Sequence, residues 1–213
     1  MLMLLTLAAA ATLFALGAIV ADWNERRPPV FKVLKPLTTI LIIGIALAAP
    51  ESGYRNWVTA ALVLSLAGDI CLMFESDRAF IGGLSSFLLA HLAFIAAFLQ
   101  GLQVHQLPAW IGLVLLLGLG YFVWLLPRTG KMKLPVLVYG LVLFGMALTA
   151  AMRWQAWGNT GSALALAGAL VFIVSDSSLA FRRFVRRYAG AQALILSTYW
   201  SAIGLIAAST HLL

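Results

Sequence analysis

The 213-residue chain is 63% hydrophobic and only 10% charged, and its mean hydropathy is +1.01. So few polar side chains cannot cover a water-facing surface, which excludes a soluble globular protein and indicates one that is solvated by lipid. The net charge of +7 lies mostly between apolar runs and marks membrane topology, so no nucleic-acid partner is expected. A single cysteine, Cys71, can form no disulfide within the chain.

Eight apolar runs follow one another, each bounded by charges, prolines or glycines. Because a helix needs roughly 20 mostly apolar residues to cross the bilayer core, the runs predict an all-α, polytopic membrane protein of eight transmembrane helices in one domain, residues 1–213. The first run has its charges after the apolar stretch, which favours a retained helix over a cleaved signal peptide. The second is short, and its helix could begin as early as Val30. The runs are 2–21, 36–49, 57–74, 81–99, 110–126, 134–152, 162–181 and 191–212.

Lysine and arginine gather in alternate connections between these runs. The first, third, fifth and seventh connections hold twelve of the 14 basic residues, whereas the even connections hold only Arg55 and Arg153. Positively charged connections tend to stay in the cytoplasm. The bias therefore predicts cytoplasmic odd connections and both termini on the opposite side of the membrane. A bacterial inner (plasma) membrane is the expected location.

Asp69 and Asp176 are the only carboxylates within the predicted spans, near the cytoplasmic ends of the third and seventh. Two carboxyl groups in a low-dielectric site can share a proton, leaving one acid beside one anion, which suits general acid–base catalysis. Each aspartate could instead only bond to a neighbouring helix, but two so similarly placed favour a functional role. Ser65 lies one turn before Asp69 and could bond to it.

Three other polar side chains fall in the cytoplasmic half of the predicted bundle. Tyr139 enters the sixth span from that side and Tyr199 lies about halfway along the eighth. Either tyrosine could orient a substrate or only bond across the bundle. Lys35, where the second helix meets the cytoplasmic surface, could bind a lipid phosphate, although snorkelling to the headgroups is the commoner role.

His91 lies near the middle of the fourth span, where it could take part in function or only hydrogen-bond between helices. A catalytic zinc ion normally has three protein ligands. Because His105 and His211 lie toward the opposite face, no bound metal is expected, and no cofactor motif is present.

A faint internal repeat relates the two halves of the chain. GDICLMF around Asp69 resembles SDSSLAF around Asp176, each with leucine three and phenylalanine five residues later. His91 follows Gly82 by nine residues, and Tyr199 follows Gly190 by nine. Four spans separate the partners, so the pattern predicts two parallel four-helix repeats with the site between them. Chance is the alternative, because the match is weak.

Six segments, taken in order, resemble the YhhN family. They are KPLTT at Lys35, LAGDICLMF at Asp69, GGLSSFLLAH ending at His91, LPVLVYG at Tyr139, VSDSSLAF at Asp176 and LILSTYW at Tyr199. That family includes transmembrane lysoplasmalogenases. The resemblance implies a membrane hydrolase that cleaves the vinyl ether bond of lysoplasmalogens to a fatty aldehyde and a glycerophospho-base.

On this interpretation one of Asp69 and Asp176 is the general acid, while the other stabilises the cation and activates water, as paired carboxylates do in glycosidases. The partners are membrane lipids and a lysophospholipid of the cytoplasmic leaflet, whose headgroup is expected near Lys35 and Arg182. The sequence does not define an oligomeric state. Two other functions remain open, a small-molecule or lipid transporter and a non-catalytic lysolipid-binding protein.

Overall fold

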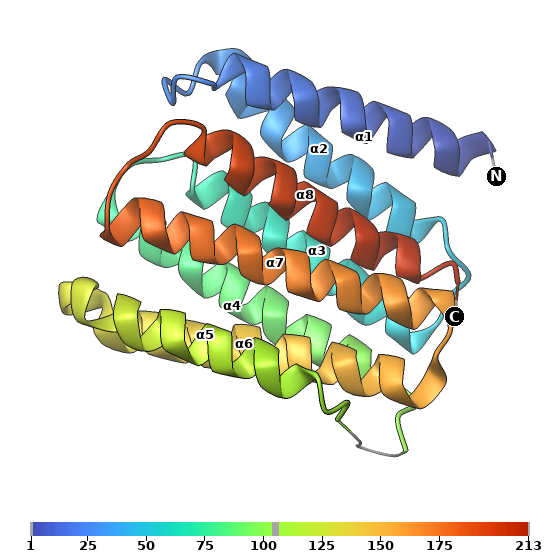
Figure 1. Ribbon diagram of the computed structural model, residues 1–213. Coiled ribbons are helices and arrows are strands. Elements are labelled where there is room, and N and C mark those ends of the chain that lie inside the picture. Colours follow the sequence, from blue (N-terminus) through green and yellow to red (C-terminus); the bar gives the residue numbers. More distant parts are fainter. Residues whose placement is uncertain (1, 104–106, 213) are drawn as a thin grey trace.

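The computed structural model describes residues 2–103 and 107–212, which form eight α-helices lying side by side along one common direction (Figure 1). The described residues contain no strand, so the predicted all-α class is confirmed. The described chain begins and ends at the same end of the bundle, as an even number of crossings requires (Figure 1). The helices are α1 (Leu2–Ala21), α2 (Pro29–Leu47), α3 (Gly53–Cys71), α4 (Asp77–Leu99), α5 (Ile111–Leu125), α6 (Lys133–Trp157), α7 (Thr160–Phe184) and α8 (Ala191–Ser209).

Seven of these helices are long and apolar enough to cross a membrane. The remaining helix, α3, has a lower mean hydropathy because it carries Arg55, Asn56 and Asp69. Its 19 residues nevertheless extend for about 28 Å at 1.5 Å per residue, close to the thickness of a bilayer core. Because α3 packs between α2 and α4 and also contacts α8, Asp69 is buried against protein, whereas Arg55 and Asn56 lie in the first turn of the helix. The chain is therefore a polytopic integral membrane protein.

The second helix begins at Pro29, before the predicted run and next to Val30, the earlier start that the sequence left open. Pro28 and Pro29 open α2, where a missing N–H is harmless and a fixed φ favours the first helical turn. Pro36, which marks the start of the predicted run at 36–49, lies inside the helix instead. Its ring removes one backbone hydrogen bond there. The proline was thus a poor boundary signal, because α2 continues through it.

Arg153 lies inside α6 and is only 1% exposed, although the sequence placed it in a connection. Its guanidinium donates to the carbonyl oxygens of Phe98 (3.2 Å) and Gln100 (2.8 Å), at the end of α4. It also lies 4.2 Å from the ring centroid of Tyr54 and 3.8 Å from that of Trp157. Helix-end carbonyls lack intrahelical partners, so this arginine stabilises the joint between α4 and α6.

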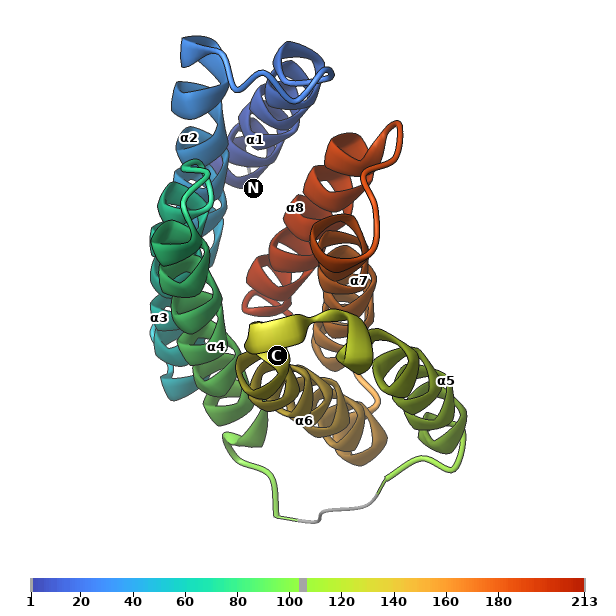
Figure 2. The same cartoon turned by 90° about the vertical axis from the view of Figure 1, so that its left-hand side faces the viewer.

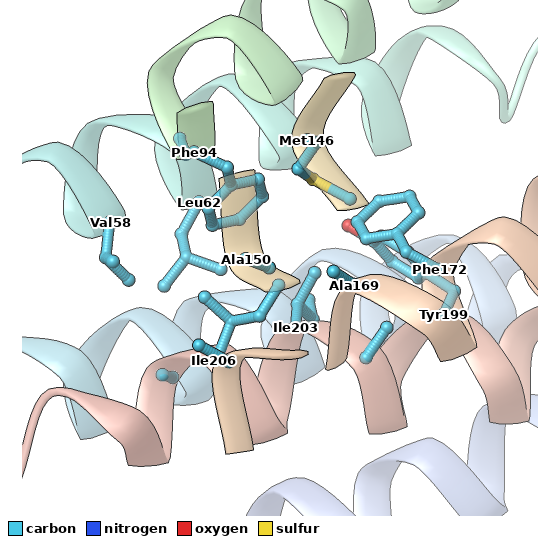
Figure 3. Packing of buried hydrophobic residues seen from close by; sticks show 14 of the residues in the cluster. Val58, Leu62, Phe94, Met146, Ala150, Ala169, Phe172, Tyr199, Ile203 and Ile206 are labelled. Carbon is cyan, nitrogen blue, oxygen red and sulfur yellow. The ribbon is translucent and has the colours of Figure 1, made fainter. Parts of the chain in front are cut away.

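The core forms where α3, α4, α6, α7 and α8 meet (Figure 3). Small residues let these helices approach closely, as is common in membrane bundles. A Cβ added at Gly168 on α7 would lie 2.6 Å from Ile206 Cγ1 and 2.7 Å from the Ala202 carbonyl oxygen on α8. The labelled core residues are Val58, Leu62, Phe94, Met146, Ala150, Ala169, Phe172, Tyr199, Ile203 and Ile206.

Two helices lie at the edges of the bundle. α1 packs against α2 and α8, whereas α5 lies at the opposite edge beside α6 (Figure 2). Two short 3₁₀ helices, η1 (Leu126–Arg128) and η2 (Gly130–Met132), join α5 to α6. Within α5 only Ile111 and Leu125 are buried, so most of this helix faces the membrane.

Candidate active site

Asp69, near the end of α3, is 1% exposed and makes close polar contacts through both carboxylate oxygens. Its Oδ1 lies 3.3 Å from Lys35 Nζ, which also donates to the Asp69 backbone carbonyl at 3.2 Å. Its Oδ2 accepts hydrogen bonds from Thr39 Oγ1 and from the Tyr199 hydroxyl, each at 2.7 Å. A buried carboxylate with a cationic partner and two hydroxyl donors is well suited to remain ionised.

Lys35 and Thr39 reach Asp69 together because they are four residues apart on α2 and so share one helix face. The Lys35 side chain is only 7% exposed, so it points into the bundle and does not snorkel to the surface. Trp200 Nε1 donates to Thr39 Oγ1 at 3.4 Å and holds the hydroxyl from α8. Thr39 was not among the predicted site residues, although its spacing from Lys35 could have indicated it.

Asp176, near the end of α7, has different partners. Its Oδ2 accepts a hydrogen bond from the Tyr139 hydroxyl at 2.5 Å. His91 Nε2 lies 3.9 Å away, beyond hydrogen-bond range, and neither ring nitrogen of His91 has a hydrogen-bond partner within residues 2–103 and 107–212. The His91 ring packs edge-on against Phe172, 4.7 Å between centroids. Asp176 therefore has an aromatic and weakly polar environment without a lysine or arginine partner among the described residues.

The two aspartates take their partners from equivalent positions in the two halves of the chain. Asp69 on α3 meets the preceding helix, α2, and the last helix, α8. Asp176 on α7 meets the preceding helix, α6, and the last helix of the first half, α4. A parallel repeat of four helices would produce this exchange. The repeat itself remains a prediction.

Two cavities meet at Asp176. A polar cavity of about 450 Å³ is lined by Asp69, Lys35 and Tyr199 and opens toward the charged ends of the helices. An apolar cavity of about 820 Å³ lies among α4, α5, α6 and α7 and is lined by Tyr139. Asp176 lines both cavities. Each volume falls within the range of roughly 300–1,000 Å³ typical of ligand sites.

Most of the predicted site residues thus converge. Five of them line one or both cavities: Lys35, Asp69, Tyr139, Asp176 and Tyr199. His91 lines neither cavity, but its Nε2 lies 3.9 Å from Asp176 Oδ2. Ser65 is different, because its hydroxyl donates to the Ala61 carbonyl oxygen at 2.9 Å, so the predicted bond to Asp69 is wrong, and it lines neither cavity. A substrate-binding role for Ser65 and His91 remains a prediction.

The predicted lack of a metal rested partly on the other two histidines. His105 falls outside the described residues. His211 Nε2 lies 2.8 Å from the Ile45 carbonyl oxygen, at the end of the bundle away from both aspartates. No group of three metal-ligating side chains occurs in the part of the chain that the structure describes.

The connection between α1 and α2 lies beside the polar cavity. Asp22, 1% exposed, accepts hydrogen bonds from the Arg27 backbone N–H at 2.5 Å and from Gln192 Nε2 at 2.8 Å. Burial raises the pKa of the Asp22 carboxyl above its ordinary value, although the Arg27 hydrogen bond opposes this. Arg182 contacts both Glu25 Oε1 (3.3 Å) and Gln192 Oε1 (2.5 Å). No sequence pattern indicates this network, because it joins the connection after α1 to residues near the end of the chain.

Eight apolar helices around two intramembrane aspartates, with a polar and an apolar cavity between them, define a polytopic membrane protein with a candidate acid–base site. The chain belongs to the YhhN family, whose family model matches residues 30–210.

Named relatives come from mammals and bacteria. The chain is 34% identical to Lysoplasmalogenase TMEM86B of Homo sapiens over 179 residues, 83% of this chain and 74% of that protein. It is 34% identical to Lysoplasmalogenase TMEM86B of Sus scrofa over 172 residues, 79% of this chain and 70% of that protein. It is 33% identical to the Lysoplasmalogenase of Mycobacterium bovis over 179 residues, 78% of this chain and 64% of that protein. No solved structure matches the chain.

Proposed function

We propose that this protein is a lysoplasmalogenase, a membrane hydrolase that cleaves the vinyl ether bond of an alkenyl lysophospholipid. The observation that carries the proposal is the position of Asp176 between the apolar and the polar cavity. In such a lipid the vinyl ether lies where the hydrocarbon chain joins the glycerol. A lysolipid with its chain in one cavity and its headgroup in the other therefore has the scissile bond beside Asp176. The names of the relatives support the same substrate.

The two cavities suit the two parts of this substrate. The hydrocarbon chain lies in the apolar cavity, whose lining is mostly apolar and so resembles the bilayer interior from which the chain comes. The phosphate lies in the polar cavity, toward Arg186 and Arg187, which form no ion pair within the described chain. Lys35 is the less suitable phosphate ligand, because Asp69 already engages it. The cations that line this cavity are Arg27, Lys35, Arg182, Arg183, Arg186 and Arg187.

We assign the general acid to Asp176 and the anion to Asp69. Lys35 and two hydroxyl donors stabilise a charged carboxylate at Asp69. An isolated charge in an apolar environment is costly. Asp176 is surrounded by aromatic rings and by the imidazole of His91, which can be neutral, rather than by a permanent cation. Asp176 is therefore the neutral carboxylic acid, and Tyr139 donates to its Oδ2 so that the proton on the other oxygen can face the substrate.

Cleavage begins with proton transfer to carbon. Asp176 gives its proton to the second carbon of the alkenyl chain, the double bond becomes single, and an oxocarbenium ion forms at the first carbon. The Asp69 carboxylate stabilises this cation and accepts a proton from water, whose oxygen bonds to the first carbon to give a hemiacetal. Asp176 is now ionised and Asp69 protonated.

Collapse of the hemiacetal restores both groups. Asp176 removes the proton from the new hydroxyl, the bond from the first carbon to the glycerol oxygen breaks, and Asp69 protonates the departing oxygen. The products are a fatty aldehyde and a glycerophospho-base, and one water is consumed. The exchange of roles between two carboxyl groups resembles that in glycosidases.

The first experiment is to measure aldehyde release by the purified protein in detergent. Alkenyl lysophospholipid is compared with an ester-linked lysolipid for the wild type, Asp69→Asn, Asp176→Asn and a control, Glu51→Gln, whose exposed side chain lines neither cavity. We expect aldehyde from the alkenyl lipid with the wild type and Glu51→Gln only. In D₂O the aldehyde gains one deuterium at its second carbon. Folded wild-type protein that binds the lipid and releases no aldehyde would instead indicate a lysolipid-binding protein or transporter.

We further propose a bacterial inner-membrane location, with the basic connections and the polar cavity in the cytoplasm and both termini outside. The excess of lysine and arginine in the odd connections supports this orientation. With this orientation, the headgroup of the bound lysolipid would lie in the cytoplasmic leaflet. Reporter domains fused after Leu212 and, separately, within the connection at Arg128 test it. Activity of a periplasm-specific reporter at Arg128 would reverse the orientation.

A further inference from the structure

We propose that the hydrocarbon chain of the substrate enters the apolar cavity sideways from the bilayer, through an opening between α5 and α7. The inference rests on the proposed function and adds the route and the residues at its threshold. Leu117 on α5 and Val174 on α7 form the two edges of this opening.

The exposure of the cavity lining locates the opening. Nearly all described residues that line the apolar cavity are buried or partly buried, and three are exposed: Leu117, Val174 and Arg186. Arg186 lies beyond the end of α7, at the charged end of the bundle. Leu117 (66% exposed) and Val174 (48% exposed) lie within apolar helices. The cavity therefore reaches the surface at a point where that surface faces lipid.

The packing of α5 leaves this side of the cavity open. α5 packs against α6, at the edge of the bundle, and makes few described contacts with α7 (Figure 2). Its links to α7 lie at the cytoplasmic end, where the Tyr121 hydroxyl donates to the Ser177 carbonyl oxygen at 2.7 Å. One turn further, Trp124 stacks on Phe181, with ring centroids 6.0 Å apart. The two helices are thus joined at one end and separated deeper in the membrane.

The opening leads directly to Asp176. Val174 lies two residues before Asp176, about 3 Å along the helix axis. Leu117 lies one turn before Tyr121, whose hydroxyl reaches the level of Ser177. We infer that a hydrocarbon chain occupies this route, because the cavity between the threshold and Asp176 has a mostly apolar lining. At the Asp176 carboxyl group the apolar cavity meets the polar one. Entry by this route keeps the chain in an apolar environment throughout, while the headgroup moves along the membrane surface.

A matched pair of substitutions tests the route. Leu117→Trp places a large ring at the threshold, whereas Leu116→Trp places the same ring on a neighbouring residue that is equally exposed (66%) and does not line the cavity. Each variant is assayed in vesicles with a long-chain alkenyl lysolipid, and in dilute detergent with a water-soluble analogue whose chain is short. Thermal unfolding in detergent establishes that both variants are folded.

For Leu117→Trp we expect kcat/KM on the long-chain lipid to fall by about tenfold or more, as an added barrier of roughly 1.4 kcal/mol implies. Leu116→Trp and all reactions of the short analogue should stay within about twofold, a change of under 0.5 kcal/mol. Equal losses in the two variants, no loss in Leu117→Trp, or an equal loss on the short analogue would overturn the proposal. Lack of aldehyde from the wild type with either lipid would refute the proposed function instead.

A second variant keeps the test decisive if the tryptophan disturbs folding. Leu117→Ala widens the threshold, so a long-chain substrate with a bulky aromatic group on its tail should gain kcat/KM relative to the wild type. Leu116→Ala should give no gain. The opposite ranking of these two alanine variants would also overturn the proposal.

Discussion

Asp69 and Asp176 occupy matching positions near the ends of α3 and α7, yet their surroundings differ in charge. Asp69 has an ammonium group 3.3 Å away and two hydroxyl donors, whereas Asp176 has one tyrosine and an imidazole at 3.9 Å. The residue type is the same, so the partners must distinguish the two chemical roles. On the proposed assignment, the neighbouring helices α2 and α6, rather than the aspartates themselves, therefore distinguish the anion from the acid.

The residues just before the aspartates differ as well. Gly68 precedes Asp69, and a Cβ there would lie 2.6 Å from Phe87 Cε2, so the missing side chain lets that ring rest against α3. Ser175 precedes Asp176, and its hydroxyl donates to the Ile195 carbonyl oxygen on α8 at 3.1 Å. Phe87 lines both cavities. The first aspartate is thus set in a tighter packing arrangement than the second.

The largest expected effect is the loss of proton donation at Asp176. Asp176→Asn keeps the side-chain shape but cannot supply an acidic proton, so kcat should fall by about 10²–10⁴. Asp176→Glu moves the acid yet retains it and should keep more activity than the asparagine variant. Single-turnover rates of aldehyde formation measure both. Equal rates for Asp176→Asn and the wild type would remove Asp176 from the mechanism.

The next effect concerns the ion pair at Asp69. Lys35→Met leaves a buried carboxylate without its cation and should lower the free energy of unfolding by about 3–5 kcal/mol. The double variant Lys35→Met with Asp69→Asn removes both charges, so it should recover most of this stability while remaining inactive. Unfolding in mixed micelles, followed by circular dichroism, gives the two values. Full activity of the double variant would show that the anion is dispensable.

The hydrogen bonds from the two tyrosines should contribute unequally to stability, because one accepting carboxyl group is proposed to be charged and the other neutral. A hydrogen bond to a charged group contributes about 1.5–3 kcal/mol and one to a neutral group about 0.5–1.5 kcal/mol. Under the proposed assignment of an ionised Asp69 and a neutral Asp176, Tyr199→Phe should therefore destabilise the protein more than Tyr139→Phe. Both variants can be compared in one unfolding assay. The reverse order would contradict the assignment of charge.

A packing substitution tests the tighter arrangement around Asp69. Gly68→Ala places a methyl group against the Phe87 ring, and overpacking of this kind costs roughly 1–3 kcal/mol. Gly204→Ala is the control, because a Cβ there meets no atom within 4 Å among the described residues. We expect a lower unfolding temperature for Gly68→Ala alone. Similar unfolding temperatures would mean that Phe87 moves aside without cost.

The smallest effect is a pH dependence at Asp22, outside the membrane-spanning helices. Burial raises the pKa of Asp22, so the folded state binds the carboxyl proton more tightly than the unfolded state does. The resulting contribution to the free energy of unfolding is present at low pH and is lost as the pH rises through the folded-state pKa. Asp22→Asn imitates the neutral form. Its unfolding temperature should exceed that of the wild type at alkaline pH, and the difference should shrink on acidification. A difference that grows at low pH would reverse this sign.

Much of this arrangement could be predicted from the sequence because polar residues are rare in membrane spans and each one is conspicuous. The contrast between apolar spans and rare polar residues predicted the eight helices and the positions of Asp69, Asp176, Lys35, Tyr139 and Tyr199. Features that depend on the packing of distant segments could not be predicted in this way. The hydrogen bond between Asp22 and Gln192 joins residues 170 positions apart. Arg153 marks the end of a span in the sequence, and only its carbonyl partners on Phe98 and Gln100 show that it lies inside a helix bundle.

Infrared spectroscopy of the protein in lipid tests the separation of charge most directly. A protonated carboxylic acid has a C=O stretching band that a carboxylate lacks. At neutral pH the difference spectrum of the wild type minus Asp176→Asn should contain this band, and that of the wild type minus Asp69→Asn should contain the carboxylate bands instead. If the protonated band is lost in Asp69→Asn and retained in Asp176→Asn, the acid and the anion are assigned the wrong way round.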